Sequence, residues 1–265
     1  MEKHLKVLLA VMFFCAWPAA AQDEGFRFTY EYWAEGYEPS ADLKRPAGEQ
    51  VTVEVRGNRV RAVSPREIHV INVKSGELLY IERTAKTFGY AQLGAYMDHM
   101  RSVNQIAADA VAQFPPALRE LAERQRRAKG IDPLRWISTA RRGRDAASKC
   151  AFVDGRIGSE VQLSVCADAA LSGPAAEALA QLEETVAAAT GGQRIIGIFG
   201  TFPWPLDFPF SQFGVPAVVE RSTGSGGPNA SLRVHLELRE SGSAQVPSSA
   251  FSPPADFRQV DLFDR

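Results

Sequence analysis

Apolar and polar residues alternate along the first third of the chain, which is the pattern of strands that bury one face. From Phe26 to Ala34, apolar residues stand at every second position. A period of two over this length predicts a strand with one face in the core. The alternation resumes at Val51 and continues, interrupted by turn-forming residues, to Tyr90. We therefore expect several neighbouring strands in one antiparallel sheet.

The first turn signal in this sheet is Gly57-Asn58, which separates two short alternating runs. A two-residue turn at this position predicts that Val55 lies opposite Val60 and that Glu54 lies opposite Arg61. Apolar residues then pair on one face and opposite charges pair on the other. This agreement supports the hairpin and its register.

A second hairpin is expected over residues 67–81, where the same pattern repeats. Its turn is predicted at Ser75-Gly76, which places Lys74 opposite Glu77. One further strand is expected to end at residues 88–90. The N-terminal part of the sheet is thus predicted to be a meander.

After residue 92 the apolar residues recur every three or four positions, which is the period of a helix. Pro115-Pro116 ends this pattern before a more polar helix that carries Leu118 and Leu121. The apolar row is expected to cover the concave face of the sheet. Its members are Leu93, Tyr96, Met97, Met100, Val103, Ile106, Ala107 and Val111.

Strands return in the second half of the chain, with one more helix among them. That helix is expected to begin near Ser172, with Pro174 in its first turn. Its apolar side carries Leu179, Leu182 and Val186. The strands are expected near Trp136 and over residues 150–153, 160–165, 217–221 and 232–239. Strands and helices in this order predict an α+β fold.

Cys150 and Cys166 are expected to form a disulfide across a hairpin. A turn centred on Gly158 places the two cysteines directly opposite each other. Such a bond closes a loop of about 15 residues and contributes about 3 kcal/mol in the chain-entropy model. A redox role would need a CxxC motif or an exposed reactive thiol, and the sequence shows neither.

The N-terminus has the pattern of a secretory signal peptide. Lys3 and Lys6 precede an apolar run over residues 7–17, and Ala19-Ala20-Ala21 follows it. We expect cleavage after Ala21, a periplasmic or secreted product, and one domain over residues 22–265. No later stretch is long and apolar enough to predict a transmembrane helix.

The charged residues are unevenly distributed, with an excess of basic residues in one segment. Without the leader the chain has 28 basic and 30 acidic residues, because Lys3, Lys6 and Glu2 are removed from totals of 30 and 31. This balance does not favour nucleic acid as a partner. Residues 119–149, however, contain ten Lys or Arg and four Asp or Glu, a local net of +6. The segment is either a solvated helix face and loop, or a surface that docks on anionic lipid or an acidic partner.

The sequence assigns no catalytic residue, metal ligand or cofactor, and we expect no enzyme. His69, His99 and His235 are solitary, and none has a second histidine or cysteine at ligand spacing. The chain contains no G-x-S-x-G elbow, no H-E-x-x-H and no phosphate loop.

Short motifs occur in a particular order along the chain, at residues 55–61, 150–155, 165–168, 214–216, 246–247 and 251–254. Taken together, they resemble the periplasmic LolA/LolB-like lipoprotein-carrier superfamily, and more closely an uncharacterised exported branch of it. The resemblance implies a strongly curved antiparallel sheet, an open half-barrel whose concave face is closed by helices. It also implies a hollow that receives acyl chains. The carriers tether a lid helix through an arginine. Arg59 or Arg61 stands near that position, but a pair with Glu54 explains Arg61 equally well.

The resemblance and the apolar pattern together predict a non-enzymatic protein that binds an acyl chain or another amphiphile. The alternative is a structural module of the cell envelope that engages a protein partner and has no small-molecule ligand. The aromatic-proline segment 202–210 is either a lid over the hollow or part of the core, and burial of most large aromatics favours the core. The expected ligand-binding residues are Leu93, Tyr96, Met97, Met100, Phe202, Trp204, Phe208 and Phe210.

Overall fold

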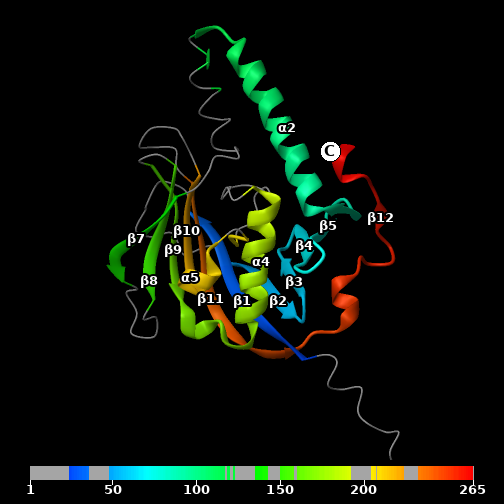
Figure 1. The fold of residues 1–265 in the computed structure, drawn as a ribbon, viewed down its shortest axis with the longest axis vertical. Helices are drawn as coiled ribbons and strands as arrows, with labels where there is room; N and C mark the ends of the chain where they lie inside the picture. Colours follow the sequence, from blue (N-terminus) through cyan, green and yellow to red (C-terminus); the bar gives the residue numbers. More distant parts are fainter. Residues whose placement is uncertain are drawn as a thin grey trace, which may run out of the picture.

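The computed structural model describes most of the chain after the expected leader. The described residues are 24–35, 48–116, 118–119, 122, 135–142, 150–157, 160–191, 204–206, 208–223 and 232–264. Within these ranges, twelve strands form one curved sheet that does not close into a barrel (Figure 1). The α+β class and the open, mostly antiparallel sheet agree with the sequence. The expected leader, residues 1–21, and Phe202 lie outside the described residues.

The strands follow one another in two meanders that are joined by the pairing of β1 with β11. The order across the sheet is β12-β6-β5-β4-β3-β2-β1-β11-β10-β9-β8-β7, and all neighbours are antiparallel except β12 and β6. The first meander comprises β1 (Glu24–Glu35), β2 (Glu49–Arg56), β3 (Arg59–Val63), β4 (Glu67–Asn72), β5 (Glu77–Glu82) and β6 (Thr87–Gln92). The second comprises β7 (Arg135–Arg142), β8 (Ala151–Ile157), β9 (Glu160–Asp168), β10 (Val215–Thr223) and β11 (Leu232–Gln245), and β12 (Arg258–Gln259) completes the sheet.

The helices pack on one face of this sheet, which we call the helix face. Alternate residues of β1 and β2, among them Phe28, Tyr30, Val51 and Val53, point to this face and are fully buried. They contact the apolar side of α4 (Ala176–Ala189), where Leu179, Leu182 and Val186 are buried as the helical spacing predicts. The short helix α5 (Phe210–Phe213) follows the aromatic-proline segment and packs beside α4. Short 3₁₀ helices also occur in the described ranges: η2 (Ala169–Leu171), η3 (Gly173–Ala175), η4 (Ser248–Phe251) and η5 (Leu262–Asp264).

Helix α2 (Leu93–Ala112) begins and ends close to the predicted residues, but only its first turns are packed against the fold. Leu93 and Met97 are buried in the core. Beyond Met100 the helix extends away from the sheet (Figure 1), and Val103 and Ile106 are exposed. We expected the whole apolar row of α2 to cover the sheet, but the residues in the second half of this row do not. In the described part of the chain, no helix combines the length and apolar character needed to cross a membrane.

The opposite face of the sheet carries a second, smaller core under the C-terminal segment. Ile68, Val70, Leu79 and Ile81 alternate with residues of the helix face, and they contact Val246 and Phe251. The chain then returns along β6, where Arg258 and Val260 donate backbone hydrogen bonds to the carbonyls of Lys86 and Phe88. The C-terminal residues thus bury apolar side chains of β4 and β5 that would otherwise face solvent.

The register of the first hairpin is the predicted one. Val55 pairs with Val60 and Glu54 pairs with Arg61 around Gly57-Asn58. This hairpin is therefore confirmed in both its turn and its side-chain pairs.

The register predicted for the second hairpin is wrong by two residues. Glu77 pairs with Asn72, not with Lys74, so the turn has four residues and not two. The Asn72 side chain is the reason: it accepts hydrogen bonds from the backbone N–H groups of Lys74 and Ser75, at 3.1 and 3.2 Å. Gly76 closes the turn with φ of 69°, a conformation that favours glycine.

The predicted disulfide between Cys150 and Cys166 is present, with its Cα atoms 5.3 Å apart. The two cysteines do not lie directly opposite each other, as the sequence predicted, because Phe152 is the residue that pairs with Cys166. A register shift between Gly155 and Arg156 moves the two strands relative to the simple hairpin. The bond therefore links the residue just before β8 to the interior of β9.

Candidate functional site

An open cleft lies where one flank of α4 faces the ends of strands β1, β2 and β11, and we call it the α4 cleft. Its volume is about 1110 Å³. Its apolar lining consists of Phe26, Val55, Val73, Pro174, Ala178 and Ala244. The lining thus comes from segments that are distant in the sequence and that meet at one end of the sheet.

The α4 wall of the cleft is held by a hydrogen bond from the helix to a strand turn. The Thr185 hydroxyl lies 2.6 Å from the carbonyl oxygen of Val73 and 2.7 Å from that of Gln181. The turn itself is tied to its neighbour, because the Val73 N–H donates to the Asn58 carbonyl at 2.8 Å. The apolar positions of α4 face the core, so Glu177, Gln181 and Glu184 are left along the edge of the cleft.

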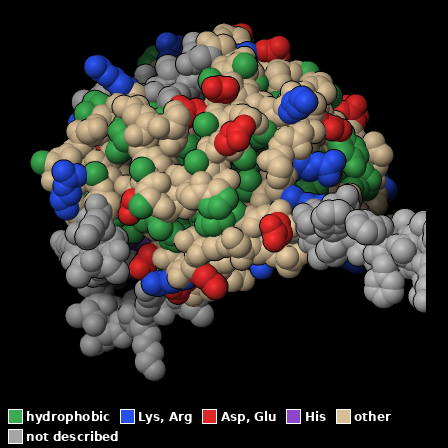
Figure 2. All heavy atoms as spheres, turned by 60° about the horizontal axis from the view of Figure 1, so that its bottom comes forward, with side chains coloured by type: hydrophobic (Ala, Val, Ile, Leu, Met, Phe, Trp, Pro, Cys, Tyr) green, Lys and Arg blue, Asp and Glu red, His purple; other side chains and the backbone are tan. Residues whose placement is uncertain are grey.

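The rim of the α4 cleft is more acidic than basic. Of the residues that the structure describes, the acidic Glu24, Glu177 and Glu184 and the basic Lys74 line it. Figure 2, which brings the lower end of Figure 1 forward, shows acidic side chains lying among hydrophobic ones on this face. A cleft of this kind can take an apolar chain below the rim and a polar group at the rim, and the rim carboxylates disfavour an anionic group.

The ligand-binding residues expected from the sequence do not line this cleft. Leu93, Met97, Trp204, Phe208 and Phe210 are buried members of the main core. Tyr96 is partly buried and packs against the same core, and Met100 is partly exposed on α2. Phe202 lies outside the described residues. In the described part of the chain, the segment 204–210 is thus core, the interpretation that the sequence favoured over a lid.

The aromatic segment is fixed by polar contacts that cross the core. The hydroxyl of Tyr30 donates to the carbonyl of Pro216 at 3.0 Å and accepts from Nε1 of Trp204 at 3.1 Å. Trp204 stacks on Phe210, with ring centroids 5.0 Å apart, and Phe208 meets Trp136 edge to face at 4.9 Å. Burial raises the pKa of Tyr30 well above its ordinary value, and the Trp204 hydrogen bond offsets only part of this shift.

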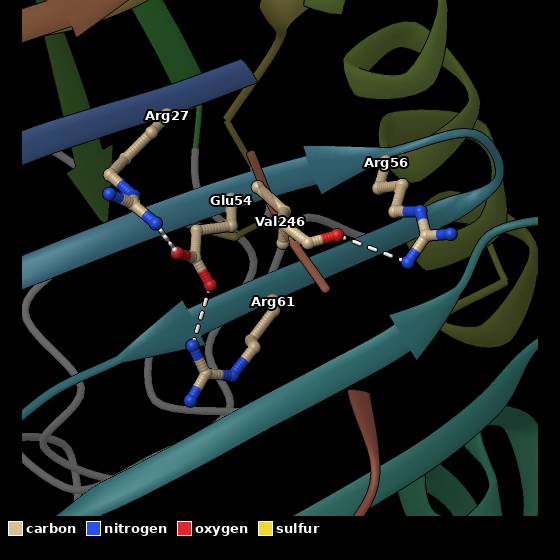
Figure 3. Close-up of polar contacts among 5 residues, drawn as sticks. All are labelled: Arg27, Glu54, Arg56, Arg61 and Val246. Carbon is tan, nitrogen blue, oxygen red and sulfur yellow. Dashed lines mark hydrogen bonds and ion pairs between the residues drawn. The ribbon is translucent and has the colours of Figure 1, made fainter. Parts of the chain in front are cut away.

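The opposite face of the sheet holds a buried carboxylate between two arginines (Figure 3). Glu54 accepts from Nε of Arg27 at 2.9 Å through one oxygen and from Arg61 through the other. Its side chain is 6% exposed, against 42% for Arg27 and 19% for Arg61. Beside this group, Arg56 donates to the carbonyl of Val246 at 3.0 Å, which anchors the C-terminal segment. Glu54 thus links β1, β2 and β3, and this role accounts for Arg61 without a lid.

A small hollow of about 360 Å³ lies beside Glu54, lined mainly by polar residues such as Thr29, Thr52 and Gln50. The two guanidinium groups and one carboxylate leave one net positive charge there, which Glu240 at the edge of the hollow balances. The arrangement therefore holds strands together and offers no excess charge to a ligand.

The described residues contain no group of three or more His, Cys, Asp or Glu side chains that could hold a metal ion. The three histidines of interest lie apart: His69 packs against Tyr80, His99 against Phe263, and His235 stacks on Trp33. Each has an aromatic neighbour, so their surroundings are those of packed side chains.

Sequence reasoning did not find the α4 cleft. Its lining residues have no common spacing, and they belong to separate strand ends and one helix flank. The only local signal was the polar side of α4, which carries Glu177 and Glu184 beside the small residue Ala178.

Comparison of this chain with protein-family models gives no match, and comparison with curated proteins gives none either.

Proposed function

We propose that the protein is a non-enzymatic binding protein that holds the apolar chain of an amphiphile in the α4 cleft. The observation that carries this proposal is an open volume of about 1110 Å³ whose buried lining residues, Val55, Val73 and Ala178, are apolar and form its floor, while the charged lining residues are exposed at its rim. Small-molecule sites usually measure about 300–1,000 Å³ and combine apolar lining with a few polar groups. The signal peptide pattern and the disulfide support the periplasm, an oxidising compartment, as its place of action.

The rim favours one class of polar head over another. Among the described residues, three carboxylates and one ammonium group line the cleft, so a ligand carboxylate would meet like charges. We therefore propose a ligand with a neutral or cationic head. An acyl chain, which the LolA/LolB-like resemblance implies, fits the floor when its head group is of this kind.

Displacement of N-phenyl-1-naphthylamine, a fluorescent apolar probe, tests the proposal. Hexadecyltrimethylammonium should displace the probe at a concentration at least about tenfold lower than palmitate does, because palmitate brings a carboxylate to the rim. Ala178→Phe should weaken probe binding, since Ala178 is buried in the floor of the cleft. Ala188→Phe, at an exposed position of the same helix, is the matched control and should bind the probe normally.

A substitution at the rim of the cleft tests the same proposal without changing the packing of the core. Glu184→Lys changes an exposed position and should narrow or reverse the preference for the cationic amphiphile. Failure of the unsubstituted protein to bind the probe, or unchanged preference in the variant, would contradict the assignment of the ligand to this cleft.

A second candidate is a structural module of the cell envelope without a small-molecule ligand. The burial of Trp204, Phe208 and Phe210 supports it, because the protein's own side chains fill the space where the sequence predicted a hollow. Absence of probe binding, together with a partner recovered by crosslinking in the intact periplasm, would favour this candidate.

A further inference from the structure

The hollow of about 360 Å³ beside Glu54 has a polar floor made by neighbouring strands. Thr29 of β1 lies next to Thr52 of β2 on one side and next to Glu240 of β11 on the other. These side chains belong to the face of the sheet opposite the helices, because Tyr30, the next residue of β1, is buried on the helix face. Side chains paired across strands lie about 5 Å apart, so the three polar groups border one small volume.

The side chains of this floor have hydrogen-bonding capacity that the described residues do not use. Within the described ranges, no hydrogen bond or ion pair joins the side chain of Thr29, Thr52, Gln50 or Glu240 to another residue. A hydroxyl or a side-chain amide can both donate and accept hydrogen bonds, whereas a carboxylate only accepts them. The hollow therefore offers donors and acceptors together to a ligand.

Ion pairs fix the floor at both of its ends. At one end lie the ion pairs of Glu54 with two arginines (Figure 3). At the other end Arg239 donates to Glu31 at 2.8 Å and to Glu237 at 2.9 Å. Arg239 is also the extra residue of a β-bulge that begins beside Thr29, and bulges are frequent next to functional sites. The hydroxyl groups thus lie on a rigid part of the sheet, between charges that are already paired.

A glycine leaves room above this floor. Gly242 lies opposite Arg27 and lines the hollow, and a Cβ atom at this position would meet no other atom within 4 Å. Val63, which lies beside Thr52, adds an apolar patch to the lining. The volume of about 360 Å³ falls at the lower end of the range of about 300–1,000 Å³ that is usual for small-molecule sites. The hollow is therefore suited to a small ligand.

We propose that this hollow binds a neutral saccharide. Sugar hydroxyl groups both donate and accept, so they complement the threonine hydroxyls, and a hydrogen bond from one of them to the Glu240 carboxylate is a strong, charge-assisted one. The C–H groups of a sugar ring can contact Val63. The balanced charge of the lining does not attract an ion, and an acyl chain would leave the polar floor without partners. The hollow shares only Ser243 and Ala244 with the described lining of the α4 cleft, so its ligand does not depend on that cleft.

Saturation-transfer difference NMR with maltotriose, cellotriose and chitotriose, three neutral trisaccharides, tests this proposal. At least one of them should bind the purified protein saturably, with a Kd of about 1 mM or tighter. Glucose should displace the bound trisaccharide at a concentration at least about threefold lower than glucuronate or glucosamine does. Each of these two brings one charge that the paired groups of the hollow do not match.

Two substitutions change the hollow without removing a contact of the fold. Thr52→Val keeps the shape of the side chain and should weaken binding at least about threefold, because a hydroxyl that meets the sugar is lost. Its control is Thr84→Val, at an exposed turn position. Gly242→Leu fills the open space and should weaken binding at least about tenfold. Its control is Gly94→Leu on α2, where a Cβ also meets open space. Both controls should bind within about twofold of the unsubstituted protein, and urea unfolding should show that neither hollow variant is destabilised.

No saturable binding of any of the three trisaccharides would overturn the proposal. Unchanged binding by the Thr52→Val and Gly242→Leu proteins, or tighter binding of glucuronate than of glucose, would also overturn it. Ala178→Phe, which blocks the α4 cleft, should bind the trisaccharide normally, and Gly242→Leu should bind the apolar probe normally. A failure of the cleft proposal and a failure of the saccharide proposal are therefore distinguishable.

Discussion

Replacing Tyr30 with phenylalanine removes one oxygen atom from the centre of the core and should destabilise the fold measurably. Tyr30 is fully buried, and its hydroxyl has two partners: it donates to Pro216 and accepts from Trp204. Phenylalanine fills nearly the same space, so the change leaves little cavity. It does leave the Pro216 carbonyl and the Trp204 indole N–H without this partner.

The expected loss follows from the two groups that lose their partner. A buried polar group without a hydrogen bond costs about 1–3 kcal/mol, so two such groups cost about 2–6 kcal/mol. The variant no longer has to bury the hydroxyl, which offsets part of this, and we expect a net loss of about 2–4 kcal/mol. With a urea dependence of about 3 kcal/mol/M for a chain of this size, the unfolding midpoint should fall by about 1 M.

Urea unfolding with the disulfide intact, followed by circular dichroism and by tryptophan fluorescence, measures this loss. Tyr90→Phe is the control, because Tyr90 is 43% exposed, and it should change the free energy of unfolding by less than about 0.5 kcal/mol. In a Trp204→Phe background, Tyr30→Phe should cost less, since one of its two partners is already absent. An unchanged or raised midpoint for the single variant would refute the argument.

The same side chain predicts a pH dependence. Because burial raises the pKa of Tyr30 in the folded state above the unfolded value of about 10, the folded protein favours the protonated phenol. This contribution to stability is complete below about pH 10 and is lost as the pH rises toward the folded pKa. The free energy of unfolding should therefore fall less steeply above about pH 10 in the Tyr30→Phe protein than in the Tyr90→Phe control.

Two further predictions concern a charge and a backbone position. Glu54→Gln leaves Arg27 and Arg61 without their carboxylate. Because both guanidinium groups keep some contact with solvent, we expect the free energy of unfolding, measured in urea, to fall by about 1–2 kcal/mol. A gain in stability would contradict this expectation. Gly214→Ala should cost about 3 kcal/mol or prevent folding, since φ is 85° and a Cβ would meet the backbone of η2. Gly191→Ala, with φ of 65° and open space, should cost only about 1 kcal/mol.

The sequence was sufficient where structure is decided by neighbours along the chain. The Gly57-Asn58 hairpin was predicted with its register, because apolar and charged pairs both constrain it. The second hairpin was not, since the Asn72 side chain competes for backbone donors and lengthens the turn. The disulfide was predicted from the compartment and the cysteine count, but the strand shift near Gly155 could not be seen in the alternation.

Features that depend on distant segments could not be predicted in this way. Helical spacing identified the apolar residues of α2, but it does not show which turns of the helix pack against the rest of the protein. The turns beyond Met100 do not, and they project from the fold. The segment 246–264 gave no signal that it would cover β4 and β5. The α4 cleft arises because strand ends and a helix flank meet, and no local pattern marks such a meeting.

The position of β1 in the middle of the sheet has a consequence for how the chain is made. On one side β1 pairs with β11, beginning with Glu24 opposite Gln245, and on the other side it pairs with β2. Synthesis proceeds from the N-terminus, so the strand that is made first gains its second partner only when almost the entire chain exists. Until then β1 has an open edge, and pairings of such long sequence separation form slowly. An incomplete chain therefore lacks the pairing of β1 with β11 that joins the two meanders into one sheet.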